Sequence, residues 1–152
     1  MSLKKLFSIA VLLLFFNQCF AYTLDGRVVW VVDGDTVHVR DKSQKLHKVR
    51  LSGINAPEKK RAFSNKAKRY LISLVYDTRV RVYWQKRDKY GRILGKIITA
   101  GRDINLAMVR GGYARWYRRY AAEQSKVDRV LYRHAEQRAK NERRGIWRYR
   151  GL

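Results

Sequence analysis

The alternation of apolar and polar residues in the first third of the chain predicts β-strands. β-Branched residues dominate three short segments, at 27–32, 36–40 and 45–51. In the second and third segments side chains alternate as they do on a strand with one buried face. Asp33-Gly34 and residues 41–44 supply turn-forming residues between the segments. We therefore expect a three-stranded meander.

The following part of the chain predicts a helix and two further strands. After Pro57, apolar residues recur at helical spacing with Lys and Arg between them, which indicates an amphipathic helix over about 60–75. Strand-like segments at 79–84 and 92–99 then flank a loop at 88–91.

Two more helices are expected toward the C-terminus. Asp103 is placed to cap a short helix that ends at Gly111-Gly112. A last helix, over roughly 121–143, would carry an apolar stripe made of Val127, Val130, Leu131, Ala135 and Ala139. Ile146-Trp147 is placed to pack back against this helix.

Five short strands, with one helix after the third strand and helices at the end, indicate an α+β fold with a mainly β core. The pattern fits a five-stranded OB-type Greek-key barrel with three packed helices. Barrels of this type handle nucleic acids and oligosaccharides across one face.

Residues 1–21 have the features of a bacterial secretory signal peptide. Two lysines precede an apolar run at 6–16 that is too short to span a bilayer. Cleavage after Ala21 would leave 22–152 as one domain in the periplasm or outside the cell, and the membrane would matter only during export. That domain would lack the chain's single cysteine, Cys19, and could form no disulfide. A membrane-tethered helix is the alternative.

The charge of the chain predicts a polyanionic partner. The formal net charge is +23, from 35 Lys and Arg against 12 Asp and Glu. Phosphates neutralised by such a surface release condensed counterions, which favours association. Anionic membranes and lipopolysaccharide would be attracted by the same charge, and a surface that only keeps the protein soluble is the plainer reading. Charge alone therefore selects polyanions and not nucleic acid in particular.

The few acidic residues are informative because four of them lie at turns: Asp33, Asp35, Glu58 and Asp88. A meander would bring the loops that hold the first three to one end of the sheet. Hard oxygen ligands, without a cluster of Cys or His, favour Ca²⁺ or Mg²⁺. The Asp-Gly-Asp segment by itself also fits an Asx turn with Gly34 at positive φ.

Phosphodiester cleavage requires a positioned water, a carboxylate near it, and positive charge on the phosphorane of the transition state. Arg50 and Arg92, at strand ends, are placed to supply that charge. The planar fork of arginine grips two phosphate oxygens at once.

Four blocks of the sequence together resemble the thermonuclease, or staphylococcal nuclease, family. They are VDGDTV at 32–37, RLSGINAPE at 50–58, DKYGR at 88–92 and RGIW at 144–147. The blocks follow the family's order and cover nearly the whole chain after residue 21.

The resemblance implies an OB-fold enzyme that cleaves DNA and RNA with one bound Ca²⁺. It implies that Asp35 ligates the metal and that Glu58 orients or deprotonates the attacking water. Arg50 and Arg92 would bind and stabilise the phosphate.

The resemblance also implies that Lys89 and Tyr90 lie near the bound nucleotide. The sequence departs from the family pattern at two positions. At Asn55 the family usually has a second metal-binding aspartate, and Ala56 would contribute its main-chain carbonyl. One carboxylate fewer should weaken Ca²⁺ binding. We therefore expect a working enzyme that needs more Ca²⁺.

The segment 112–120 interleaves aromatic residues with arginines, so Tyr117 and Tyr120 are candidates for stacking on bases. Tyr113 and Trp116 fit the core better. Two rival functions stay open: an OB module that binds nucleic acid without cleaving it, and a cationic protein that binds polyanions or membranes. No stable protein partner is implied, and we expect a monomer with DNA and RNA as substrates.

Overall fold

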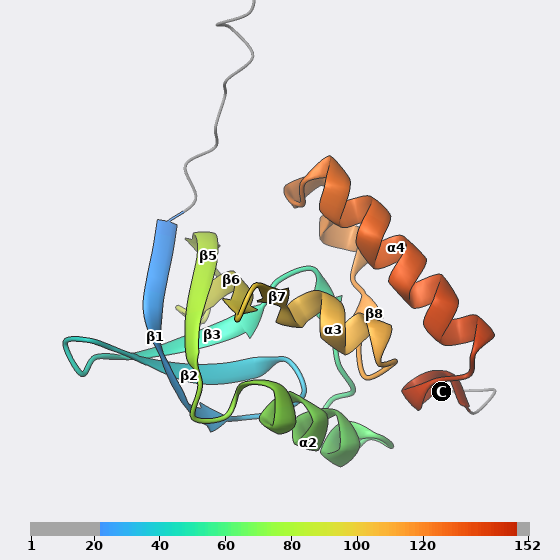
Figure 1. The fold of residues 1–152 in the computed structure, drawn as a ribbon, viewed down its shortest axis with the longest axis horizontal. Helices are drawn as coiled ribbons and strands as arrows, with labels where there is room; N and C mark the ends of the chain where they lie inside the picture. The colour runs from blue at the N-terminus through green and yellow to red at the C-terminus, as the bar shows by residue number, and fades with distance from the viewer. Residues whose placement is uncertain (1–21, 149–152) are drawn as a thin grey trace, which may run out of the picture.

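The computed structural model describes residues 22–148, which form a strand barrel with helices packed against it (Figure 1). The expected signal peptide, 1–21, lies outside the described residues. The strands are β1 (Tyr22–Val31), β2 (Thr36–Asp41), β3 (Leu46–Leu51), β4 (Ile54–Asn55), β5 (Arg79–Arg87), β6 (Ile93–Thr99), β7 (Arg102–Asp103) and β8 (Arg115–Trp116). The helices are α2 (Ser64–Val75), α3 (Ile104–Arg110) and α4 (Lys126–Asn141), with 3₁₀ turns η1 (Arg118–Glu123) and η2 (Gly145–Arg148).

Five strands close the barrel. Their order is β3-β2-β1-β5-β6, and a parallel pairing of β3 with β6 joins the two edges. The other neighbouring strands of the barrel pair antiparallel. The predicted OB-type barrel with three packed helices is therefore confirmed. The short strands β4 and β8 form a separate pair beside it.

Alternation along the strands fills the barrel with β-branched side chains. On β2, Val37 and Val39 are fully buried, whereas Arg40, the next residue of the same strand, is exposed. The register of β1 against β2 shifts between Val28 and Trp30, so one extra residue of β1 is accommodated there. As a result Val28 is fully buried while Trp30 is 56% exposed.

Helix α2 begins later than predicted. Phe63 precedes the helix with a φ of 67°, in the left-handed region, so the helical run cannot extend back to residue 60. From Ser64 onward the predicted amphipathic pattern holds, and Ala67, Leu71 and Val75 are fully buried against the barrel. The segment before the helix, which includes Glu58, is thus left as a loop.

Helix α3 is capped as predicted. The Asp103 carboxylate accepts a hydrogen bond from the backbone N–H of Leu106 at 2.9 Å. The same carboxylate accepts from the hydroxyl of Tyr132 on α4, at 3.1 and 3.2 Å. One aspartate therefore caps the start of α3 and also fixes α4 against it.

The predicted apolar stripe of α4 is right at two of its five positions. The helix covers Lys126–Asn141, shorter than expected, and Ala135 and Ala139 are buried. The other three predicted members are exposed, at 67% for Val127, 45% for Val130 and 43% for Leu131. Tyr132 and Glu136 take the buried face with Ala135 and Ala139 because each finds polar partners: Tyr132 bonds to Asp103, and Glu136 accepts from Trp116, Arg118 and Lys140. Apolar periodicity alone cannot reveal such positions.

None of the helices between residues 22 and 148 combines the length and the hydropathy that a transmembrane segment requires.

Candidate active site

The loop between β1 and β2 positions Asp35 through an Asx turn. The Asp33 side chain accepts a hydrogen bond from the backbone N–H of Asp35 at 3.1 Å, so the expected turn is present. The expectation of a positive φ at Gly34 is wrong. Gly34 is instead required by close packing, because a Cβ there would lie 2.7 Å from the Cβ atoms of Ala56 and Ala67.

Asp35 lies almost fully buried, 7% exposed, where this loop meets the residues after β4. Its Oδ2 accepts from the backbone N–H of Ala56 at 2.8 Å, and its Oδ1 accepts from the Thr36 hydroxyl at 3.2 Å. Arg50 approaches the carboxylate at 3.1 Å. Burial raises the pKa of Asp35 to about 6, against the opposing effects of Arg50 and the Ala56 N–H.

Arg50, near the end of β3, is held by main-chain and side-chain oxygens. Its Nη1 donates to the carbonyls of Leu51 at 2.7 Å and Ile54 at 3.0 Å. Its Nη2 donates to the Oδ1 of Asn55 at 3.1 Å and lies 3.1 Å from the Asp35 carboxylate. The guanidinium group thus joins Asp35 and Asn55, two of the predicted metal ligands.

Arg92 is held by an aspartate to which the sequence assigned no specific role. The Nε of Arg92 donates to Asp88 Oδ2 at 2.7 Å, while Asp88 Oδ1 accepts from the backbone N–H groups of Tyr90 and Arg92 at 2.9 and 3.0 Å. Burial opposes ionisation of Asp88, but these hydrogen bonds outweigh it and hold its pKa below the usual value. The sequence did contain a signal for this contact: an aspartate lies four residues before an arginine, with a Tyr-Gly turn between them.

Both arginines line one pocket of about 410 Å³. The pocket also includes every predicted substrate-binding residue: Lys89, Tyr90, Tyr117 and Tyr120. Lys89 Nζ lies 5.0 Å and Arg92 Cζ 5.4 Å from the centre of the Tyr90 ring, which is 71% exposed. The Tyr117 and Tyr120 rings meet edge to face at 5.1 Å. We call this cavity the phosphate pocket.

Two further residues of the phosphate pocket were not foreseen. Lys86 donates to Glu123 at 2.6 Å, and its Nζ lies 5.8 Å from the centre of the Tyr120 ring. This pair ties the end of β5 to η1 and so fixes one wall of the pocket. As expected, Tyr113 and Trp116 pack partly buried against the core instead.

Glu58 lies apart from the phosphate pocket. It is exposed in the loop before α2, and it lines a second cavity of about 300 Å³ together with Asn55, Ala56 and Arg115. The two cavities share no lining residue. The hydrogen bond between Arg50, in the first cavity, and Asn55, in the second, connects them.

The oxygen atoms around Asp35 fit a hard divalent cation in kind. Asp35 and Asn55 both place a side-chain oxygen 3.1 Å from the same nitrogen of Arg50, so the two oxygens converge. Within the described part of the chain, no three side chains of His, Cys, Asp or Glu gather as a metal site. A cation here would therefore depend on amide and main-chain oxygens beside one buried carboxylate.

Several known bacterial proteins are similar to this chain over most of its length. The family described as staphylococcal nuclease homologue matches residues 48–149. A Haemophilus influenzae protein named uncharacterized endonuclease is 35% identical over 146 residues, covering 95% of this chain and 79% of that protein. An Escherichia coli protein of the same name is 39% identical over 138 residues, covering 90% and 86%. The micrococcal nuclease of Shigella flexneri is 35% identical over 131 residues, covering 80% and 72%.

These matches confirm the resemblance drawn from the four sequence blocks, and they extend it over nearly the whole chain. The chain belongs to the staphylococcal nuclease family.

Proposed function

We propose that this protein is an exported, Ca²⁺-dependent endonuclease that hydrolyses phosphodiester bonds of DNA and RNA. Family membership and the names of its relatives support a nuclease. The observation that carries the proposal is the convergence of Arg50 and Arg92 on one pocket lined by three tyrosines, of which Tyr90 and Tyr120 are exposed. Bases stack on such rings while the arginines take the phosphate.

The two arginines would stabilise the negative charge that develops on the phosphorane. Arg50 is held by the carbonyls of Leu51 and Ile54, and Arg92 by Asp88. Donors fixed before the substrate binds need little reorganisation during the reaction, which is the main source of this kind of electrostatic stabilisation. The Arg92 contact with Asp88 uses its Nε–H, so the N–H groups of both Nη atoms can meet phosphate oxygens. Four of the five N–H groups of Arg50 already point at protein oxygens, so Arg50 would exchange some of these contacts for phosphate.

Glu58 is proposed to take a proton from the attacking water. As the water oxygen bonds to phosphorus, the bond to the leaving oxygen breaks on the opposite side. Glu58 lines the cavity on the Asn55 side of Arg50, so the water would approach the phosphate from that side. The exposure of Glu58 leaves room for both water and substrate.

Asp35, the side-chain oxygen of Asn55 and the main-chain carbonyl of Ala56 are proposed to hold the Ca²⁺ ion. The ion would neutralise charge on a phosphate oxygen and help to orient the attacking water. Arg50 already contacts Asp35 and Asn55. A Ca²⁺ ion bound by these two residues and a phosphate bound by Arg50 are therefore expected either to compete or to lie side by side.

Removal of the Glu58 carboxylate tests the proposed mechanism. Cleavage of plasmid DNA, single-stranded DNA and RNA is measured with Ca²⁺ and with excess chelator. We expect Glu58→Gln to lower the rate by a factor on the order of 10²–10⁴ without changing DNA affinity in chelator. Glu142→Gln, which removes an exposed acid just after α4 that pairs with Arg138 and Arg144, is the control and should cleave normally. Equal rates for the Glu58 variant and the parent would contradict the mechanism.

Binding without cleavage is the outcome that would favour a non-catalytic OB module. A protein that binds single-stranded DNA but never cuts it, at any Ca²⁺ concentration, would be such a module. The intact set of Arg50, Glu58 and Arg92 argues against that outcome.

Export and a monomeric state belong to the same proposal. Sequencing the N-terminus of the protein recovered from periplasm and medium should give Tyr22 as the first residue. A cell-associated protein that retains Met1 would contradict export. Sedimentation of the purified protein should give the mass of one chain.

A further inference from the structure

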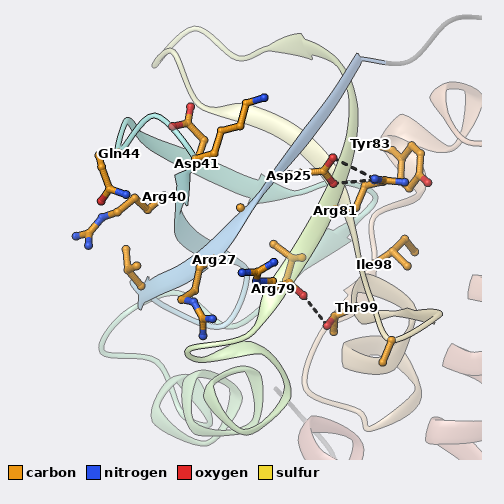
Figure 2. A pocket seen from close by; sticks show the side chains of 15 residues that line it. Asp25, Arg27, Arg40, Asp41, Gln44, Arg79, Arg81, Tyr83, Ile98 and Thr99 are labelled. Carbon is orange, nitrogen blue, oxygen red and sulfur yellow. Dashed lines mark hydrogen bonds and ion pairs between the residues drawn. The ribbon is translucent and has the colours of Figure 1, made fainter.

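A row of three arginines crosses the outer surface of the barrel on three neighbouring strands. Arg27 of β1 is the direct register partner of Arg40 on β2 and of Arg79 on β5. Figure 2 shows Arg40, Arg27 and Arg79 following one another across these strands. We call Arg40, Arg27 and Arg79 the arginine row.

The arginine row lies in a groove that is separate from the phosphate pocket. The groove encloses about 750 Å³ along β1, β5, the end of β6 and the turn after β2. None of its lining residues lines the phosphate pocket. Five cationic residues face two acidic ones in it: Arg27, Arg40, Lys42, Arg79 and Arg81 against Asp25 and Asp41.

The two acidic residues of the groove are already engaged by other groups. Asp25 accepts two hydrogen bonds from Arg81, at 2.7 and 3.1 Å, as Figure 2 also shows. Asp41 lies 2.7 Å from the ring nitrogen Nε2 of His47 and accepts from the backbone N–H groups of Ser43 and Lys45. Neither carboxylate is therefore available to neutralise the arginine row.

Among the residues that the structure describes, a carboxylate partner is found only for the middle arginine, Arg27. Arg27 pairs with Asp77 at 3.1 Å, and the two side chains are 46% and 71% exposed. An ion pair so exposed contributes little to stability and is easily exchanged for another anion. Within residues 22–148 no carboxylate pairs with the guanidinium group of Arg40 or Arg79, and both residues are exposed.

The arginine row is not explained by stability. Like charges directly opposite each other on neighbouring strands destabilise a sheet. Directly paired residues have Cα atoms about 5 Å apart, so the row presents three planar forks over about 10 Å. A nucleic acid strand carries one phosphate per about 3.4 Å of helix axis, and each fork can grip two oxygens of a phosphate.

We propose that the arginine row, with Lys42, binds the phosphodiester backbone of the polymeric substrate at a distance from the site of cleavage. This proposal rests on the proposed nuclease function. The groove would raise affinity for long chains and leave substrates that fill only the phosphate pocket unaffected. A flat anionic membrane fits less well because the row lies in a concave surface.

Binding in excess chelator tests the groove without requiring cleavage. The parent is compared with Arg40→Gln/Arg79→Gln, and with Arg69→Gln/Arg133→Gln, which removes two exposed arginines of α2 and α4 instead. The probes are a long single-stranded DNA and a dinucleotide. We expect the first variant to raise Kd for the long DNA about tenfold near physiological salt. Its slope of log affinity against log salt should fall by about 1.4, since each phosphate contact contributes about 0.7.

The control variant should change both quantities by much less, and dinucleotide binding should stay the same in all three proteins. Thermal unfolding checks the fold, and loss of like-charge repulsion should leave the first variant at least as stable as the parent. Equal effects of the two variants on the long DNA would overturn the proposal. The proposal would also be overturned if the first variant bound long DNA as the parent does but no longer bound vesicles of anionic phospholipid.

The outcomes separate this proposal from the proposed function. A parent that binds long DNA through the row but never cleaves it would contradict only the nuclease. If Arg40→Gln/Arg79→Gln cleaved long DNA with the KM of the parent, only the proposed binding role of the groove would be contradicted.

Discussion

At the scale of single residues, short acidic side chains determine where the arginines of the phosphate pocket lie. Asp88 holds Arg92 through its side chain and also accepts two backbone hydrogen bonds of the turn. Asp35 receives the Ala56 N–H and approaches Arg50. The chain has few acidic residues, so these two carboxylates fix much of the geometry around Arg50 and Arg92.

Replacing Asp88 tests its positioning role. Asp88→Asn keeps an acceptor for the turn but removes the charge-assisted bond to Arg92. We expect kcat/KM to fall on the order of ten- to a hundredfold, because a displaced guanidinium no longer meets the phosphate in the transition state. Affinity for DNA in chelator should change little. Unchanged kcat/KM in a folded variant would show that Arg92 needs no such support.

Asp35 should make the stability of the metal-free protein depend on pH. Its pKa is raised to about 6 in the folded state, so its favourable contribution is complete below the ordinary value near 3.8 and is lost as the pH rises through 6. With chelator present, we expect Asp35→Asn to be more stable than the parent at pH 7.5, by on the order of 2 kcal/mol, but not at pH 4. Urea unfolding at both pH values measures the difference in stability between the two proteins. A difference that does not depend on pH would contradict the raised pKa of Asp35.

Restoring the missing carboxylate should strengthen metal binding. Asn55→Asp places a second negative charge beside Asp35, at the position where the family pattern usually has an aspartate. We expect the Ca²⁺ concentration for half-maximal cleavage to fall roughly tenfold. Titration of activity with Ca²⁺ measures this change. A half-maximal concentration equal to that of the parent would exclude Asn55 from the metal site.

At the scale of elements, the five barrel strands were predictable, whereas the short strands β4, β7 and β8 and the buried polar side chains were not. Strict alternation in β2 and β3 has one explanation, a strand with one buried face. On α4 the sequence offered two candidate faces, and the face with Tyr132 and Glu136 is buried because partners far away in the chain satisfy both side chains. Those partners lie on other elements, so periodicity could not select the face.

Close contact between elements gives a prediction at Gly34. A methyl group there would overlap the Cβ atoms of Ala56 and Ala67 at 2.7 Å. We expect Gly34→Ala to destabilise the protein by about 1–3 kcal/mol and to impair cleavage by moving Asp35. Chemical denaturation of Gly34→Ala/Ala56→Gly should show a smaller loss than the two single changes added together. Additive losses would mean that the overlap is relieved elsewhere.

At the scale of the whole molecule, the barrel brings together groups that the sequence could only list. The ordered motifs predicted the fold and most candidate residues, and Arg50, Arg92, Lys89, Tyr90, Tyr117 and Tyr120 do line one pocket. The sequence predicted that the loops holding Asp35 and Glu58 meet at one end of the sheet, and the hydrogen bond from the Ala56 N–H to Asp35 shows that these loops are in contact. The loop before α2 places Glu58 in a cavity with Asn55 and Ala56 that is separate from the phosphate pocket. Loop paths of this kind depend on tertiary packing and leave no periodic signal.

Cleavage of closed circular DNA across a Ca²⁺ titration tests the central claim most directly, because a circle without ends can be cut only by an endonuclease. We expect nicked and linear products whose rate rises with Ca²⁺, no cleavage in excess chelator, and a loss on the order of 10²–10³ in Arg92→Ala. Intact circles at every Ca²⁺ concentration, or equal cleavage in chelator, would contradict the proposed Ca²⁺-dependent endonuclease.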